Sequence, residues 1–166
     1  MNSSEHIFVK KPSECSDAEV QNFVTQVLSG GAVTALGLES RVISAAFLVF
    51  LTQGQCLKGV AALKRPKPMY RKSVSERAGI PLDVAAFPFE LGWVFVQPSA
   101  RGAGLSSKLV STALSAAPGA GVFATSRSDN TPMHRTLEHL SFIRVGCPYE
   151  SSRSSHQIQL FIRPAN

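Results

Sequence analysis

The chain has 166 residues, of which 44% are hydrophobic and only 17% charged, and this balance excludes an intrinsically disordered protein. Seventeen Lys and Arg residues against eleven Asp and Glu residues give a formal net charge of +6. That excess indicates either a solvated basic surface or a polyanionic partner or cofactor. The length suits one domain over residues 1–166.

The cysteines and the hydropathy of the chain indicate the cellular compartment in which the protein is expected. Cys15, Cys56 and Cys147 are an odd number of cysteines in no metal-like spacing, which argues against a disulfide framework. Residues 1–6 lack the apolar core of a signal peptide, and the longest apolar run, residues 43–51, is too short to span a bilayer. We therefore expect a cytoplasmic protein with no membrane partner.

The N-terminal residues predict a strand followed by a helix. The strand is expected at residues 7–9, and Ser16 with Glu19 three residues later forms a capping box. Apolar residues from Val20 to Leu28 then recur at helical spacing, until a Gly-Gly pair ends the helix. Residues 32–40 fit either a second short helix or a loop.

A β-hairpin and a basic excursion come next. Residues 42–51 and 56–63 are rich in apolar and branched side chains, and they flank a turn at residues 52–55. The excursion begins with the basic residues 64–72, which two prolines interrupt, and it continues to Pro81 with a short helical turn as one option. Because long loops in compact domains are usually functional or mobile, we expect substrate contacts or a lid here.

The second half of the chain alternates strands with helices. In chain order the expected elements are a strand at 88–96, a helix at 104–117, a strand at 121–125, a short helix from the Ser128-Asp129-Asn130 cap to about His139, a strand at 142–146, a polar connection at 148–156 and a strand at 158–162. This order predicts a mixed α/β domain.

The junction between the strand at 88–96 and the following helix is rich in glycine. Such a junction directs unpaired backbone N–H groups and the positive end of a helix dipole at one point, which suits a phosphate. A P-loop is excluded because Leu109, and not Ser or Thr, follows Lys108. The dinucleotide fingerprint fails too, since its third glycine is Ser107 and half of the chain precedes it.

The segment Arg101-Gly102-Ala103-Gly104-Leu105-Ser106 closely resembles the pyrophosphate loop of the GNAT superfamily of acetyl-CoA-dependent N-acyltransferases. Val96-Gln97-Pro98 before it, Asn130 and Phe142 all fall at the family's spacing, although Ser141 replaces the glycine before that phenylalanine. The resemblance implies the GNAT fold, an α/β (α+β) fold in which helices flank a central mixed, mostly antiparallel sheet of six or seven strands.

The resemblance also implies acetyl-CoA as the cofactor. Its pyrophosphate would lie over the backbone N–H groups of Arg101–Ser106, its pantetheine amides would pair with the backbone of Val94–Val96, and Asn130 would contact the same arm. The cofactor-binding residues expected on this basis are Val94, Phe95, Val96, Arg101, Gly102, Ala103, Gly104, Leu105, Ser106, Ser107 and Asn130.

Glu90 is the candidate catalytic residue. It lies eleven residues before Arg101, where GNAT enzymes of the histone acetyltransferase type carry their general base. It would remove a proton from the acceptor amine, directly or through a water, while a backbone N–H near Val96 would stabilise the developing oxyanion. The alternative is a structural glutamate bonded to the backbone, to Arg41 or to Arg71.

The family's usual general acid, a tyrosine seven residues after the asparagine, is replaced by Leu137. Tyr149, Tyr70, Ser128 or a water could protonate the leaving thiolate, but no motif positions any of them. The replacement therefore also permits a catalytically weak protein or a non-catalytic acetyl-CoA sensor.

The remaining reactive residue types suggest no other chemistry, and we expect no metal. His134 and His139 are five residues apart and so fall on different faces of a helix. We expect Cys147 to be a small core residue. Trp93 is expected to pack in the core, with a wall of the acyl site as the alternative.

We therefore predict an N-acetyltransferase that acts, as a monomer or a homodimer, on a primary amine that the sequence does not identify. The alternative from another class is a nucleic-acid-directed module, including one that acetylates transfer RNA, which would use the basic residues 64–72. Nucleic acid is possible but not favoured, because the chain lacks a dense basic stripe interleaved with aromatic residues.

Overall fold

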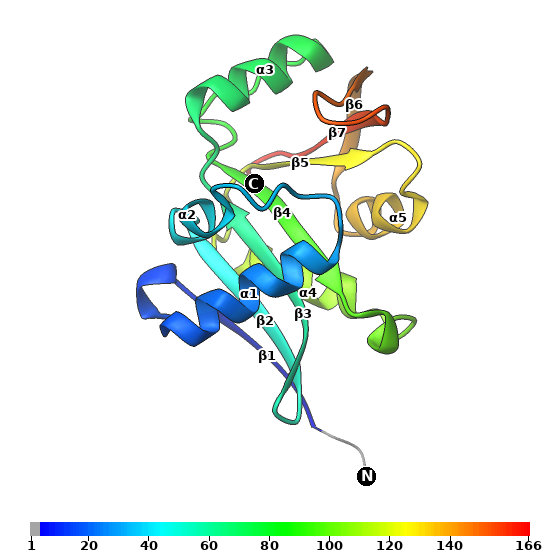
Figure 1. The fold of residues 1–166 in the computed structure, drawn as a ribbon. Coiled ribbons are helices and arrows are strands. Elements are labelled where there is room, and N and C mark those ends of the chain that lie inside the picture. The colour runs from blue at the N-terminus through cyan, green and yellow to red at the C-terminus, as the bar shows by residue number, and fades with distance from the viewer. Residues whose placement is uncertain (1–3) are drawn as a thin grey trace. The chain divides into compact units, whose positions relative to one another are not determined.

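The computed structural model describes residues 4–166 (Figure 1). Within them, seven strands follow the order β1-β2-β3-β4-β5-β7-β6, and helices flank the sheet. This is the α/β fold with a mostly antiparallel sheet that the sequence predicts. The chain divides into two compact units: the first unit is Met1–Lys64 with Leu91–Pro118, and the second unit is Arg65–Glu90 with Gly119–Asn166.

The strands of the first unit are β1 (Glu5–Lys10), β2 (Phe47–Gln53), β3 (Cys56–Lys64) and β4 (Phe89–Val96) from Leu91 onward. β1 pairs antiparallel with β2, and β2 pairs antiparallel with β3, so that Phe8 lies opposite Phe50 and Phe50 opposite Val60. The strand expected at residues 7–9 and the hairpin expected within residues 42–63 are therefore confirmed. The first strand of the hairpin, β2, begins later in the chain than expected.

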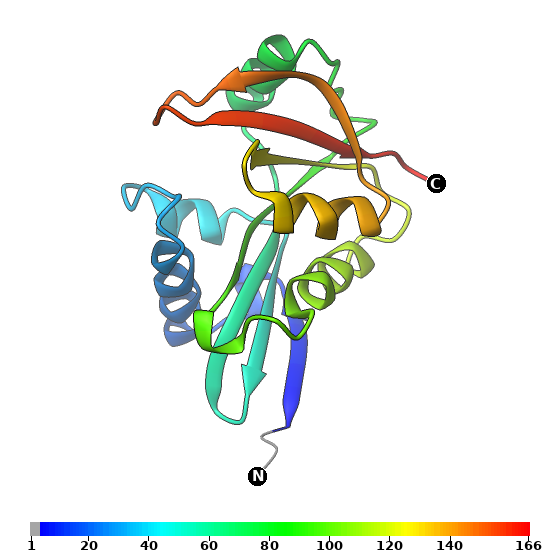
Figure 2. The ribbon, with the colours of Figure 1, turned by 90° about the vertical axis from the view of Figure 1, so that its right-hand side faces the viewer.

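Three helices cover the strands of the first unit. They are α1 (Asp17–Ser29), α2 (Leu38–Ile43) and α4 (Leu105–Ser115). Figure 2 shows α1 and α2 on one face of these strands and α4 on the other. The core under α1 includes Phe23 and Val27 together with Phe50 of β2, all at most 3% exposed.

The start of the second strand was predicted wrongly. Val42 and Ile43 belong to α2, and β2 begins only at Phe47. Val42 is fully buried and lies four residues after the buried Leu38, so the two share one face of a helix. The apolar run from Val42 to Leu51 thus contains the end of a helix, a turn and a strand, which apolar content alone does not separate.

The second unit contains α3 (Pro68–Ala78), β5 (Val122–Arg127), α5 (Thr131–His139), β6 (Ile143–Glu150) and β7 (Gln157–Arg163). β7 pairs antiparallel with both β5 and β6. Its core includes Val74 and Ala78 of α3, Leu82, Phe123 of β5 and Leu160 of β7.

Helix α3 replaces most of the expected loop. Pro68 occupies the first turn, where its missing N–H costs nothing, and Gly79 ends the helix with a φ of 73°. Arg71, Val74 and Ala78 form its buried face at helical spacing. The two prolines were interpreted as breaks, whereas Pro68 in fact marks the beginning of a helix of 11 residues.

Strand β6 also differs from expectation. It continues through Pro148 to Glu150, which the sequence assigned to a polar connection. The pairing with β7 is irregular between Val145 and Tyr149, where Gly146 has a φ of 73°. Pro148 is tolerated because it lies in this irregular stretch. Among residues 4–166 no helix is both long enough and apolar enough to cross a membrane.

Candidate functional site

The glycine-rich junction after β4 has the backbone conformation that the sequence predicts. A 3₁₀ turn at Pro98–Ala100 leads into Gly102, with a φ of 90°, and Gly104, with a φ of 72°. Helix α4 then begins at Leu105, and no side chain within residues 4–166 caps its first turn. The N–H groups of that turn are therefore left for a ligand.

The positive φ values of Gly102 and Gly104 favour glycine, and the absence of side chains there leaves open space above the loop. Non-glycine residues rarely adopt such φ values, because their Cβ atoms meet the following carbonyl. A Cβ atom added to Gly102 or Gly104 would meet no described atom within 4 Å, so the space above the loop is open. A polyphosphate can therefore approach the backbone here more closely than it could above side chains.

The side chain of Arg101 folds back onto β4. Its Nε donates to the carbonyl of Val96 over 2.9 Å, and its guanidinium lies 5.7 Å from the ring centre of Phe95. Arg101 thus braces the loop against the strand, and its positive charge stays at the base of the loop.

The backbone of β4 alternates in direction, which separates the residues expected to bind the pantetheine arm. The N–H of Gln97 donates to Lys58 of β3, and the carbonyl of Phe95 lies against Gly59 of the same strand. Since hydrogen-bonding groups alternate along a strand, those of Val94 and Val96 point away from β3. Of the three predicted residues, the backbone of Phe95 is therefore directed at β3 instead.

Trp93 interrupts β4 with a φ of 53°, a value rare for a large side chain. One residue in this conformation is typical of a β-bulge, which turns the strand locally. Its ring packs edge-on against Phe23 with 6.1 Å between centres, and the Lys64 Nζ lies 4.7 Å from its centre. The packing role predicted for Trp93 is confirmed, whereas its positive φ has no signature in the sequence.

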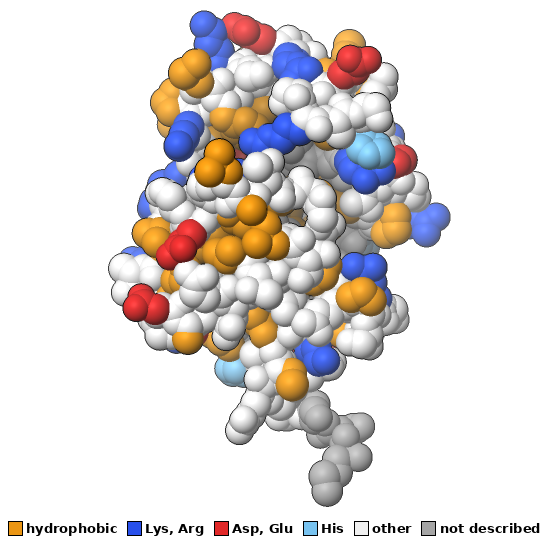
Figure 3. Space-filling view, viewed as in Figure 1, with side chains coloured by type: hydrophobic (Ala, Val, Ile, Leu, Met, Phe, Trp, Pro, Cys, Tyr) orange, Lys and Arg blue, Asp and Glu red, His pale blue; other side chains and the backbone are white. Residues whose placement is uncertain are grey.

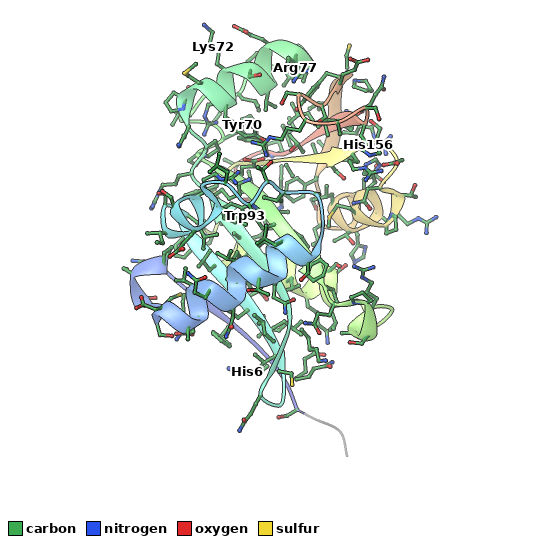
Figure 4. All side chains as sticks on the ribbon, viewed as in Figure 1. His6, Tyr70, Lys72, Arg77, Trp93 and His156 are labelled. Atoms are coloured by element: carbon green, nitrogen blue, oxygen red, sulfur yellow. The ribbon has the colours of Figure 1, made fainter. Side chains whose placement is uncertain are left out.

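In the second unit, Glu90 is buried and bonded to a tyrosine. Only 2% of Glu90 is exposed, and the hydroxyl of Tyr70 on α3 donates to its Oε1 over 2.8 Å. Figure 4 shows Tyr70 on the inner side of α3, whereas Lys72 points away on the outer side. The sequence did not indicate this partner, because the helix that positions Tyr70 was not predicted.

Tyr149 lies in the electrostatic field of the same carboxylate. Burial first, and then the negative charge of Glu90, raise the pKa of Tyr149 to about 12, while Arg77 lowers it. The guanidinium of Arg77 lies 4.9 Å from the ring centre of Tyr149. Glu90 is therefore part of a cluster that contains both tyrosines of the chain.

Arg71 was considered as a partner of Glu90, but it fastens α3 to the next segment. Its Nη atoms donate to the carbonyls of Leu82, Phe87 and Pro88, at 3.3, 2.6 and 3.5 Å. Burial lowers the pKa of Arg71, whereas the charge of Glu90 opposes that effect. Among the described residues, its Nε has no hydrogen-bond acceptor.

A groove opens in the same segment of the second unit. Its volume is about 400 Å³, and it is lined by Arg65, Pro66, Pro68, Arg71, Val84, Pro88 and Phe89. Its walls are mostly apolar, with one exposed and one buried arginine. The segment expected to contact substrate therefore contains a site that could receive one.

Comparison with known proteins identifies the family. The sequence model of the acetyltransferase (GNAT) family matches residues 44–142, which is more than half of the chain and includes both Glu90 and the glycine-rich loop. The chain belongs to the GNAT acetyltransferase family. A comparison with curated protein sequences gives no significant match.

Solved structures show that the fold of this GNAT chain is shared. An acyl-CoA N-acyltransferase from Pseudomonas aeruginosa is 14% identical, with a TM-score of 0.69 over 96% of this chain and 99% of the other. The ribosomal-protein-S18-alanine N-acetyltransferase from Escherichia coli is 13% identical, with a TM-score of 0.67 over 97% and 95%. YncA from Salmonella typhimurium, solved with acetyl-CoA, is 16% identical, with a TM-score of 0.64 over 98% and 94%.

Family membership supports acyltransferase activity with an acyl-CoA as cosubstrate. The loop fits such a molecule: its glycines are open above the backbone, and the first turn of α4 has no side-chain cap within the described residues. The residues that would hold the pyrophosphate are those from Arg101 to Ser107.

The asparagine of the GNAT pattern has a structural role here. The Oδ1 of Asn130 accepts from the N–H of Met133 over 3.3 Å and caps α5, as the sequence predicts. Leu137, at the position of the usual tyrosine, is 1% exposed and belongs to the core. The side chain there therefore completes the packing of α5.

The histidine and cysteine residues contribute to structure or to the surface. His134 is buried, its Nε2 lies 2.9 Å from the carbonyl of Arg127, and its Nδ1 accepts from Arg144 over 3.2 Å. Residues 4–166 contain no group of three or more His, Cys, Asp or Glu side chains that could hold a metal ion. Cys147 is exposed, so its predicted place in the core is wrong, because β6 presents it to solvent.

Proposed function

We propose that this protein transfers an acetyl group from acetyl-CoA to a primary amine by direct transfer, with Glu90 as the general base. The observation that carries the proposal is the Arg101–Ser107 loop, whose two positive-φ glycines open into an uncapped turn of α4 within the segment that matches the family.

Bound acetyl-CoA supplies an activated acetyl thioester, which an uncharged amine can attack. The task of the protein is to keep that amine uncharged and to hold it in place. A carboxylate within reach can take its proton, and Glu90 is the buried carboxylate that the family pattern marks. The N–H of Val96, which points away from β3, is the proposed donor to the developing oxyanion.

The groove that Arg65 and Phe89 help to line is the proposed place of acceptor contacts. It lies in the chain segment that contains Tyr70 and Glu90, and its apolar walls suit the body of an organic amine. The groove supports the expectation that the segment from residue 64 to 81 contacts substrate.

The nucleic-acid alternative has less support from the basic residues 64–72. The Nζ of Lys64 lies over Trp93, and Arg71 is buried against backbone carbonyls. Lys72 pairs with Glu76 over 3.8 Å. Figure 3 shows acidic side chains among the basic ones over α3 and no continuous basic stripe there, so we do not propose nucleic acid as the substrate.

The decisive test measures release of free thiol from acetyl-CoA with a panel of amines, amino acids, polyamines, peptides and aminoacyl-tRNA. We expect at least one primary amine to support turnover and Glu90→Gln to reduce that turnover at least a hundredfold, because general-base catalysis contributes about 10²–10⁴. Full turnover of Glu90→Gln at every pH would exclude the base role. Binding of acetyl-CoA without thiol release for any amine would identify a sensor instead of an enzyme.

A matched pair of variants tests the loop. Gly104 and Gly37 both precede a leucine, begin a helix with a φ near 72° and have no atom within 4 Å of an added Cβ. Replacing either by Glu imposes the same backbone cost, about 1–2 kcal/mol. We expect Gly104→Glu to abolish acetyl-CoA binding in calorimetry and Gly37→Glu to leave it intact. Normal binding by Gly104→Glu would show that the loop assignment is wrong.

A further inference from the structure

Helix α3 brings one tyrosine into contact with the proposed base. The hydroxyl of Tyr70 donates to the Oε1 of Glu90 over 2.8 Å, while 41% of the tyrosine is exposed and Glu90 is almost fully buried. The ring therefore extends from the surface of the second unit to the buried carboxylate.

The rest of α3 is fastened so that Tyr70 keeps this position. The neighbouring Arg71 donates to three backbone carbonyls, and its guanidinium lies 5.4 Å from the ring centre of Phe123. Ser75 donates to the carbonyl of Ile80 over 2.6 Å, and Arg77 donates to the carbonyl of Glu150. Arg71 and Arg77 thus fasten the helix to other segments of the second unit, and Ser75 closes its last turn.

We propose that Tyr70 is a positioning residue for the reaction, which fixes the carboxylate of Glu90 through its hydroxyl. This inference rests on the proposed function, in which Glu90 takes a proton from the acceptor amine. A carboxylate works more efficiently as a base when its orientation is set in advance, and a hydrogen bond from a fixed phenol helps to set it.

The hydroxyl of Tyr70 is suited to this role because it remains protonated. Burial of the hydroxyl end first, and then the charge of Glu90, raise the pKa of Tyr70 well above its usual value, although a hydrogen bond with Thr125 lowers it. The phenol is therefore a hydrogen-bond donor throughout the pH range in which the protein would work. Its proton is engaged by Glu90, so Tyr70 is not assigned the role of the missing general acid.

The kinetic test compares Tyr70→Phe, Glu90→Gln and the double variant with the unchanged protein. We expect Tyr70→Phe to lower kcat about tenfold, with KM for acetyl-CoA and for the amine changed less than twofold. In the Glu90→Gln background the same change should have no further effect, because the two residues act as one unit. Met69→Ala, next in the chain and at an 85% exposed residue, is the matched control with unchanged kcat.

A spectroscopic test measures the contact without any activity. In the Tyr149→Phe variant, Tyr70 is the remaining tyrosine, so its ionisation can be followed by ultraviolet absorbance. We expect Glu90→Gln in that background to lower the pKa of Tyr70, since a nearby negative charge is removed. An unchanged titration would overturn the contact, and with it the inference.

The outcomes separate the two proposals. If Glu90→Gln is inactive while Tyr70→Phe keeps full kcat, the general base stands and the role of Tyr70 is wrong. If the two substitutions lower kcat additively, Tyr70 acts without Glu90, and the inference is again overturned. If Glu90→Gln is fully active, the proposed base fails whatever the titration of Tyr70 shows. Thermal melting of each variant identifies any loss of activity that comes from unfolding.

Discussion

Ser141 adopts a backbone conformation that its side chain disfavours. Its φ is 71°, and it closes α5 with the hydrogen-bond pattern of a Schellman motif: Phe142 N–H donates to Leu137, and Ser141 N–H donates to Glu138. The sequence showed serine where the family has glycine, and the structure gives the physical reason for the glycine.

Ser141→Gly should stabilise the fold by about 0.5–1 kcal/mol, because glycine reaches this conformation without steric cost. Urea unfolding would measure the gain. Ser141→Ala is the matched control and should bring no gain, since alanine also carries a Cβ. A loss of stability in Ser141→Gly would show that the serine hydroxyl matters more than the backbone.

Single residues also show how much of the candidate site the sequence can predict. Gly102 and Gly104 both have positive φ values, as suits the glycine-rich turn that the local sequence pattern predicts before α4. The partner of Glu90 did not follow, since Tyr70 is twenty residues away and reaches it only through tertiary packing.

Helices α1 and α3 show which secondary-structure elements can be predicted from the sequence and which cannot. The capping box of α1 is local, and both of its hydrogen bonds form: Ser16 Oγ accepts from Glu19 N–H over 3.1 Å, and Glu19 Oε1 accepts from Ser16 N–H over 3.0 Å. The buried face of α3 includes Arg71, whose partners are distant carbonyls, so its helical pattern does not appear as an apolar stripe.

The capping box makes the stability of α1 depend on pH. The pKa of Glu19 lies below its ordinary value, first because Lys10 donates to it over 2.7 Å and then because of the Ser16 N–H. A lowered pKa means that the ionised form stabilises the folded state. This contribution is complete above about pH 4.5 and is lost as the pH falls through the lowered value.

Glu19→Gln should therefore lower the free energy of unfolding at pH 7 by less than about 1 kcal/mol, and by a smaller amount at pH 3. Urea unfolding at the two pH values measures the difference. Ser16→Ala removes an uncharged cap and should cost about 1 kcal/mol at both. An equal cost of Glu19→Gln at pH 7 and pH 3 would contradict the ionic role.

At the scale of the whole molecule, the sequence predicted one domain, and the structure contains two compact units built from alternating segments. The order of strands and helices in each unit follows local patterns and was mostly predicted. The division depends on contacts between residues far apart in the chain, such as those that join α3 to β6 and β7, which local patterns do not contain.

We expect residues 1–166 to unfold in one cooperative transition, as a single domain does. The chain offers a separate probe for each unit, because its one tryptophan, Trp93, is in the first and both tyrosines, Tyr70 and Tyr149, are in the second. Tryptophan fluorescence and tyrosine absorbance should therefore give the same denaturation midpoint. Two distinct midpoints would instead show two independently stable units.

The alternation of segments also sets an order in time during synthesis. The first unit has all of its residues once Pro118 has been added, whereas Tyr70 and Glu90 belong to a unit that is complete only with Asn166. At about 5–20 residues per second, the ribosome needs about 2–10 s for that last stretch. The Arg101–Ser107 loop can thus fold first, and the buried Glu90 and its partner Tyr70 acquire their surroundings last.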